Sequence, residues 1–126
     1  LITALLMVAI AWLSTAQTGE TYEESEAREL TASEQKFASA EAFEEAYYAV
    51  LGNCSMCHAR EPSWEGLHWA PKGVVLETEA DVARHAEQIY LQAGRTHAMP
   101  PPNAIEMDQE SRDLIVAWIK EVRNGG

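Results

Sequence analysis

Basic residues are scarce in this chain: nine Lys and Arg stand against twenty Asp and Glu, and the formal net charge at pH 7 is −11. A protein that binds nucleic acid neutralises phosphates with Lys and Arg, and this sequence has no basic patch that could do so. The same charge opposes docking on anionic lipid. We therefore exclude nucleic acid as a partner and expect a protein partner that is basic or neutral at its contact face, or is tethered to the chain.

Strand patterns and paired metal ligands are missing as well. No segment alternates apolar and polar residues convincingly, as a half-buried strand does, so we expect an all-α fold. The chain has only two cysteines, and three of its four histidines lie singly, at His68, His85 and His97. A zinc site of four nitrogen or sulfur ligands in paired spacing is therefore not indicated.

The sequence also lacks an apolar run of the about 20 residues that cross a bilayer. Residues 1–13 are apolar except for Thr3, and they begin without methionine or a basic flank. We expect residues 1–16 to be the C-terminal end of a transmembrane helix that belongs to a longer polypeptide. The core of a cleaved signal peptide is the alternative, because residues 14–16 are small enough for cleavage.

An acidic segment follows this apolar stretch. Cytoplasmic flanks of membrane helices are usually rich in Lys and Arg, whereas residues 20–29 contain Arg28 against five glutamates. We therefore predict a bacterial inner-membrane location with the remainder of the chain on the periplasmic side. Residues 17–37 are predicted to be an acidic polar linker, and residues 38–126 are predicted to form one globular domain.

The two cysteines lie in the pentapeptide Cys54-Ser55-Met56-Cys57-His58. This C-x-x-C-H pattern is typical of c-type haem attachment, in which each thiol forms a thioether with a vinyl group and the histidine can supply an axial nitrogen. A disulfide and half of a zinc site are the alternatives, and a thioredoxin-like redox pair would need a βαβ setting. We predict one covalently bound haem c, attached at Cys54 and Cys57, with His58 as an iron ligand.

A second iron ligand is predicted in residues 97–102, the strap, where His97-Ala98-Met99 precedes three prolines. A thioether sulfur is a soft ligand suited to haem iron. Proline fixes φ and lacks an N–H, so the strap is stiff and extended and can hold a methionine rigidly. Met99 is the predicted ligand. The alternatives are that Met99 fills a gap in the core, or that His97 is the ligand.

Three segments have the apolar spacing of helices, and residues 59–77 between the first two are expected to be loop. The first is expected to end at Gly52 and Asn53, the second to run from an N-cap at Thr78 to Gly94, and the third to run from near Asp108 to residues 124–126. Their apolar faces are formed by Phe43, Tyr47, Val50 and Leu51; by Val82, Ala86, Ile89 and Tyr90; and by Leu114, Ile115, Trp118, Ile119 and Val122.

In the order of these motifs, residues 38–124 resemble the class I cytochrome c family. The residues that carry the resemblance are Cys54, Cys57, His58 and Met99, the last followed by two prolines, and then an apolar final helix. The resemblance implies a small fold in which three main helices and loops wrap around the haem. It also implies that the first and last helices cross.

The family usually places a glycine and an aromatic residue at this helix crossing. In this sequence Ala46 and Val50 stand at those two positions. We expect Tyr47 and Trp118 to fill the contact in a different way.

The resemblance further suggests residues that support the haem. A ligating histidine usually donates its other ring N–H to a fixed acceptor, and the carbonyl of Pro71 is suggested as that acceptor for His58. Further candidates to cover the macrocycle or meet its propionates are Trp64, Trp69, Lys72 and Arg95. For each of these, ordinary loop packing or a solvated charge is the alternative.

Iron with both axial positions filled has no open site, so the predicted function is one-electron transfer and not catalysis. The segments around residues 59–62 and 94–102 resemble the C-terminal cytochrome domain of the bacterial membrane-bound urate oxidase (urate hydroxylase) family. That resemblance implies a fused multi-pass membrane portion, with urate as electron source, 5-hydroxyisourate as product and the respiratory chain as destination. The alternatives are a stand-alone membrane-anchored electron shuttle and a haem-based ligand-binding or sensor domain.

Overall fold

The structure is a computed structural model that describes residues 1–16 and 22–125. Every regular element in these residues is helical and none is a strand, which confirms the predicted all-α class. The elements are α1 (Ile2–Ala16), α2 (Tyr22–Ala27), α3 (Ala32–Ala38), α4 (Phe43–Cys54), the 3-10 helix η1 (Pro71–Gly73), α5 (Glu79–Arg84), α6 (Ala86–Ile89), the π-helix η2 (Tyr90–Arg95) and α7 (Gln109–Gly125).

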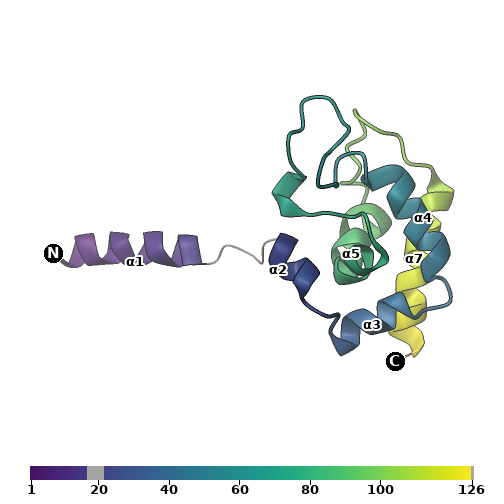
Figure 1. Cartoon of the computed structure of the whole chain (residues 1–126), viewed down its shortest axis with the longest axis horizontal. Helices are drawn as coiled ribbons and strands as arrows, with labels where there is room; N and C mark the ends of the chain where they lie inside the picture. The colour runs from purple at the N-terminus through teal and green to yellow at the C-terminus, as the bar shows by residue number, and fades with distance from the viewer. Residues whose placement is uncertain (17–21, 126) are drawn as a thin grey trace.

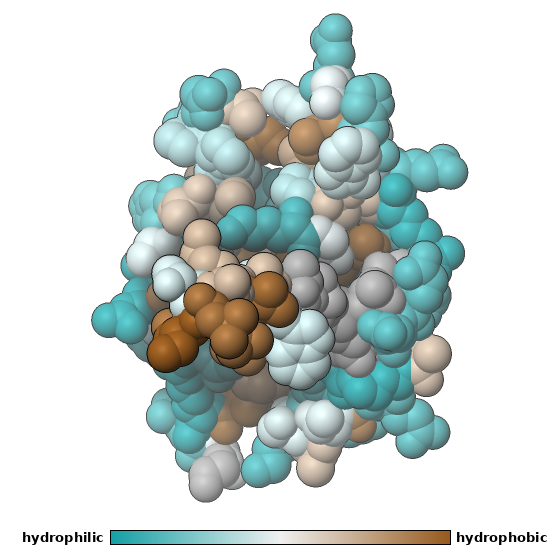
Figure 2. Space-filling view, turned by 90° about the vertical axis from the view of Figure 1, so that its left-hand side faces the viewer, coloured by the Kyte–Doolittle hydropathy of each residue, from teal (hydrophilic) through white to brown (hydrophobic). Residues whose placement is uncertain are grey.

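The apolar helix α1 lies apart from the other helices (Figure 1). Its large apolar side chains are exposed, and Figure 2, which views the molecule from the end that carries α1, shows apolar side chains gathered at the surface. None of the described helices is both long and apolar enough to cross a membrane. Residues 17–21 of the predicted linker and Gly126 lie outside the described residues.

The core lies where α4 packs against α7 (Figure 1). Ala46 and Val50 of α4 are fully buried there, so small and β-branched side chains occupy the two positions discussed above. Trp118 of α7 is fully buried beside them. Its ring lies 5.4 Å from Phe43 and 5.8 Å from Phe37, and its Nε1–H donates to the Phe37 carbonyl at 2.9 Å.

Trp118 therefore fills the contact between α4 and α7 as expected. Tyr47 packs beside this contact and also joins α4 to another segment of the chain. Tyr47 stacks on Phe43 with ring centroids 5.9 Å apart and lies at the edge of the core. Its hydroxyl donates to the carbonyl of Glu77 at 3.1 Å, which ties α4 to the segment before α5.

The first predicted helix is confirmed, but it continues through Gly52 and Asn53 to Cys54. The side-chain amide of Asn53 donates to the carbonyl of Ala49, one turn earlier, at 2.8 Å, so this residue fits a helical turn. At the other end, no side chain of Ala42 or its neighbours caps α4. The carboxylate of Glu121, on α7, accepts from the backbone N–H groups of Glu41 and Ala42, both at 2.9 Å, and so stabilises the helix N-terminus.

The second predicted helix begins as expected but is divided. Thr78 and Asp81 form a capping box, in which each side chain accepts from the other residue's backbone N–H. The α-helical geometry breaks at His85 and continues as α6 and then as η2, which ends at Arg95. The helix therefore does not end at Gly94, where its end was expected. The close packing around Gly94 gives its missing side chain another structural role.

Gly94 has little room for a side chain, because Tyr90 of its own helix and α7 both lie close to it. A Cβ at this position would lie 3.1 Å from Cδ2 of Tyr90 and 3.2 Å from Cγ2 of Val116. We expect Gly94→Ala to lower the free energy of unfolding by about 1–3 kcal/mol through overpacking. Gly52→Ala is the matched control, because a Cβ there meets nothing within 4 Å and alanine favours a helix by up to about 1 kcal/mol. Urea unfolding of both variants measures the difference; a Gly94→Ala protein as stable as wild type would contradict this packing.

Part of the segment predicted as a linker packs on the helical domain. Helix α3 begins with a capping box at Thr31 and contacts α5 and α7. Arg28 pairs with both carboxylate oxygens of Glu34, at 3.0 and 3.1 Å, and this hydrogen bonding is the main reason why the pKa of Glu34 is lowered to about 2. The side chain of Arg84 donates to the Arg28 carbonyl at 2.8 Å. The domain boundary at residue 38 stays a prediction, but residues from Arg28 onward are fastened to the domain.

Candidate functional site

The attachment motif begins where α4 ends. The Cys54 carbonyl accepts from the N–H of Cys57 at 3.2 Å and from the N–H of His58 at 2.9 Å, so one turn of chain carries all three residues. Both cysteines are free thiols. Burial and the nearby Cys57 raise the pKa of Cys54 to about 11, and the positive charge of Arg112 opposes this rise.

His58 is held on two sides by the chain that follows η1. Its Nδ1 lies 2.9 Å from the carbonyl oxygen of Val74, and its own carbonyl accepts from the N–H of Leu76 at 2.7 Å. A carbonyl can only accept, so Nδ1 carries a proton, and in the neutral ring the lone pair is then on Nε2. An imidazole in this tautomer can bind a metal through Nε2.

The resemblance suggested the carbonyl of Pro71 as the acceptor for the His58 ring. In the structure the acceptor is instead the carbonyl of Val74. The Pro71 carbonyl is occupied by the N–H of Val74, at 3.1 Å, within the tight turn of η1. Lys72 and Gly73 in this turn both have positive φ, 56° and 68°. This tight turn directs the carbonyl of Val74 toward the ring of His58.

The strap is fixed through the backbone of Met99. The Met99 N–H donates to the carbonyl of Gln92 at 2.8 Å, and its carbonyl accepts from Nη1 of Arg112 at 3.0 Å. Met99 is 37% exposed, whereas Met107 is 6% exposed and belongs to the core cluster. The core gap-filler of this region is therefore Met107, and the thioether of Met99 lies outside the core. His97, the alternative ligand, is exposed.

Arg112 was not predicted from the sequence. It lies on α7, is 5% exposed, and its Nη1 also donates to the Ala93 carbonyl at 2.8 Å. Its positive charge opposes the rise that burial causes in the pKa of Cys54. Arg112 therefore interacts both with the end of α4 and, through the Met99 carbonyl, with the strap. The spacing of 112, 115 and 119 places it on the same helix face as Ile115 and Ile119, and this spacing is a signal that could have identified it.

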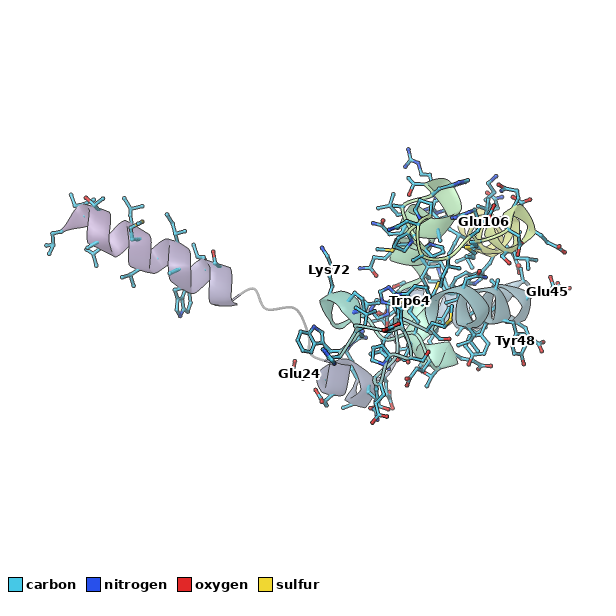
Figure 3. The ribbon with its side chains drawn as sticks, turned by 90° about the horizontal axis from the view of Figure 1, so that it is seen from above. Glu24, Glu45, Tyr48, Trp64, Lys72 and Glu106 are labelled. Carbon is cyan, nitrogen blue, oxygen red and sulfur yellow. The ribbon has the colours of Figure 1, made fainter. Side chains whose placement is uncertain are left out.

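The other predicted haem contacts differ in their surroundings. Trp64 is half-buried and its backbone N–H donates to the Met56 carbonyl at 3.1 Å, so its loop folds back on the attachment turn, residues 54–58. Trp69 is 73% exposed, and Lys72 points away from η1 into solvent (Figure 3).

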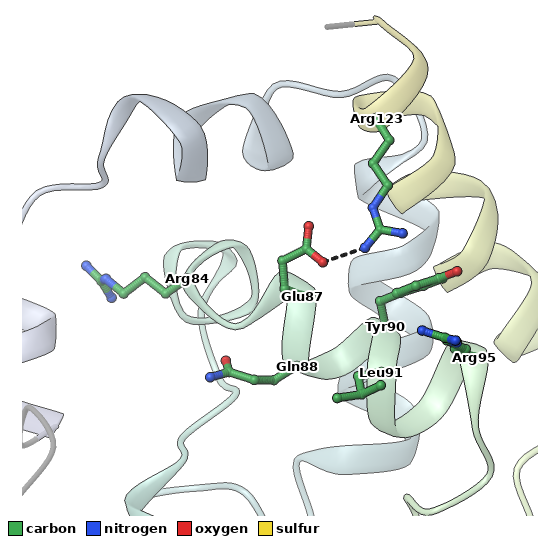
Figure 4. Close-up of a pocket in the computed structure, with 7 residues that line it drawn as sticks. All are labelled: Arg84, Glu87, Gln88, Tyr90, Leu91, Arg95 and Arg123. Atoms are coloured by element: carbon green, nitrogen blue, oxygen red, sulfur yellow. Dashed lines mark hydrogen bonds and ion pairs between the residues drawn. The ribbon is translucent and has the colours of Figure 1, made fainter.

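Arg95 is exposed. It lines a surface pocket of about 380 Å³ between η2 and α7 (Figure 4). At the same pocket, Arg123 pairs with Glu87 at 2.6 Å and stacks 4.5 Å above the ring of Tyr90. The pocket is lined by none of the residues of the attachment turn or strap.

These residues fit a covalently attached haem by their chemistry. Two thiols three residues apart, an imidazole with Nδ1 occupied and a thioether outside the core are the donors that such a group needs. Within residues 1–16 and 22–125, no three His, Cys, Asp or Glu side chains are grouped as the ligands of a metal ion. Comparisons with models of protein families, with curated proteins and with solved structures gave no match.

Proposed function

We propose that this chain is a one-electron carrier that holds one haem c between His58 and Met99. The observation that carries the proposal is the arrangement of Met99: both of its backbone polar groups are hydrogen-bonded, and its thioether stays outside the core. A backbone fixed in this way needs no further ordering when a ligand bond forms, so only the side-chain torsions of Met99 remain to be ordered by ligation.

In this proposal the haem, when bound, supplies the one-electron chemistry. Cys54 and Cys57 hold it covalently, and His58 offers Nε2 while the Val74 carbonyl fixes the ring. Met99 offers a soft sulfur, a ligand that raises the potential of haem iron. If His58 and Met99 both bound the iron, the protein would leave no position on it for oxygen or a substrate, and this favours electron transfer over catalysis.

The chain is further proposed to be the electron-relay domain of a membrane oxidoreductase, with the domain on the periplasmic side of a bacterial inner membrane. The apolar α1 and the acidic stretch after it support this placement. The resemblance of residues 59–62 and 94–102 makes the urate oxidase family the proposed parent, in which case electrons from urate pass through the haem to the respiratory chain.

A stand-alone shuttle is the second candidate, and it shares the same haem site. The sequence upstream of Leu1 in the parent gene separates the two: several membrane spans support the oxidase, and a lone anchor supports the shuttle.

An equilibrium redox titration of the haem-loaded chain tests the carrier function itself. We expect a single reversible transition with the slope of one electron. A protein that takes up no covalent haem, or whose haem is not reversibly oxidised and reduced, would refute the proposal.

A further inference from the structure

Arg112 connects three parts of the fold through one nitrogen atom. Its Nη1 donates to the carbonyl of Ala93, in η2, at 2.8 Å and to the carbonyl of Met99, in the strap, at 3.0 Å. The residue itself belongs to α7 and is 5% exposed. This hydrogen bond joins the strap to α7, the helix that packs against α4 in the core.

Arg112 is also a buried charge without an acidic partner in the part of the chain that the structure describes. Four arginines form ion pairs there, namely Arg28, Arg60, Arg84 and Arg123. A buried guanidinium that lacks a carboxylate is unfavourable unless its N–H groups are hydrogen-bonded. An apolar side chain at this position, between the strap and Ile115, would avoid that desolvation, so packing alone does not account for an arginine.

We infer that Arg112 is a positioning residue that keeps the Met99 thioether on the haem iron and, through its buried charge, favours the reduced state. This inference rests on the proposed function. A hydrogen bond from a charged donor is stronger than a neutral one, so it restrains the Met99 peptide effectively. Reduction removes one positive charge from the iron, and a fixed cation in a low-dielectric interior favours that change.

The test uses the haem-loaded full chain with two substitutions. Arg112→Met keeps an unbranched side chain but removes charge and hydrogen bonds, and Arg112→Lys keeps the charge but loses the planar fork. Arg123→Gln is the matched control, because Arg123 lies on the same helix, is exposed, and at the surface donates to Glu87 and stacks on the ring of Tyr90. Three properties are measured: hydrogen exchange at the Met99 amide, carbon monoxide binding to the ferrous protein, and the midpoint potential.

For Arg112→Met we expect exchange at the Met99 amide and apparent affinity for carbon monoxide to rise by about tenfold or more, and the potential to fall. Arg112→Lys should show faster exchange and easier carbon monoxide binding with a smaller fall in potential, which a merely structural role would not produce. Arg123→Gln should match wild type in all three properties.

The inference is overturned if Arg112→Met exchanges and binds carbon monoxide as wild type does. It is overturned equally if exchange rises while the response to carbon monoxide stays unchanged, because Arg112 would then brace the strap without acting on the iron. Should Arg112→Met fail to fold, Arg112→Lys decides by the same two measurements. Failure of the proposed function is recognised separately, since Met99→Ala would then leave the wild-type spectrum and carbon monoxide response unchanged.

Discussion

Replacing Met99 by alanine is expected to lower the midpoint potential by on the order of 0.1 V or more, within the roughly 0.8 V over which axial ligands set haem potentials. The thioether favours the ferrous state, so its loss stabilises the ferric state. The variant should also bind carbon monoxide when reduced, because one axial position is then free. The fold should be little affected, since Met99 is 37% exposed and lies outside the core cluster.

Met107→Leu is the control for this experiment. Met107 is 6% exposed and packs in the core, and leucine has a similar volume, so the change should cost less than about 1.5 kcal/mol. The potential should stay at the wild-type value. If Met99→Ala retained the wild-type potential and Met107→Leu did not, Met99 would be excluded as the ligand.

Replacing both Cys54 and Cys57 by alanine is expected to leave a protein without covalent haem that is largely unfolded. A domain of this size buries too little apolar surface to be more than marginally stable alone. The apolar face of a covalently attached haem would add buried apolar surface to the core of the folded state. The substitutions themselves remove only two sulfur atoms, both on half-buried residues. The loss of packing is comparable to one Ile→Val change for each cysteine, about 1 kcal/mol each.

Far-UV circular dichroism and thermal melting measure this effect. The single variants Cys54→Ala and Cys57→Ala, each of which keeps one thioether, should lie between wild type and the double variant. Native-like helix content and a cooperative transition in the haem-free double variant would show that the helices suffice without the haem.

Local patterns predicted the helices that local interactions determine. The apolar spacing around Phe43 and Trp118 and the capping box at Thr78 lie within single segments, and the structure places helices there. What the sequence did not predict depends on partners distant in the chain. Gly94 resembles a helix terminator, but in the structure it lies within the helix, where Tyr90 and Val116 leave little room for a side chain.

Dependence on partners distant in the chain also explains why the sequence did not predict the contacts of His58 and Arg112. The carbonyl that holds His58 depends on how tightly η1 turns, and a turn with positive φ at Lys72 moved the acceptor from Pro71 to Val74. Arg112 acts through two carbonyls that lie 13 and 19 residues away in the sequence. A periodic pattern places Arg112 on a buried face, but only the fold shows which backbone groups it meets there.

The optical spectrum of the ferric, haem-loaded wild-type protein tests the six-coordinate site most directly. A methionine-to-ferric-iron charge-transfer band at neutral pH is the result expected for iron held between His58 and Met99. A spectrum without that band, or one with the signature of a vacant axial position, would contradict the account of this chain as an electron carrier with a closed His58–Met99 site.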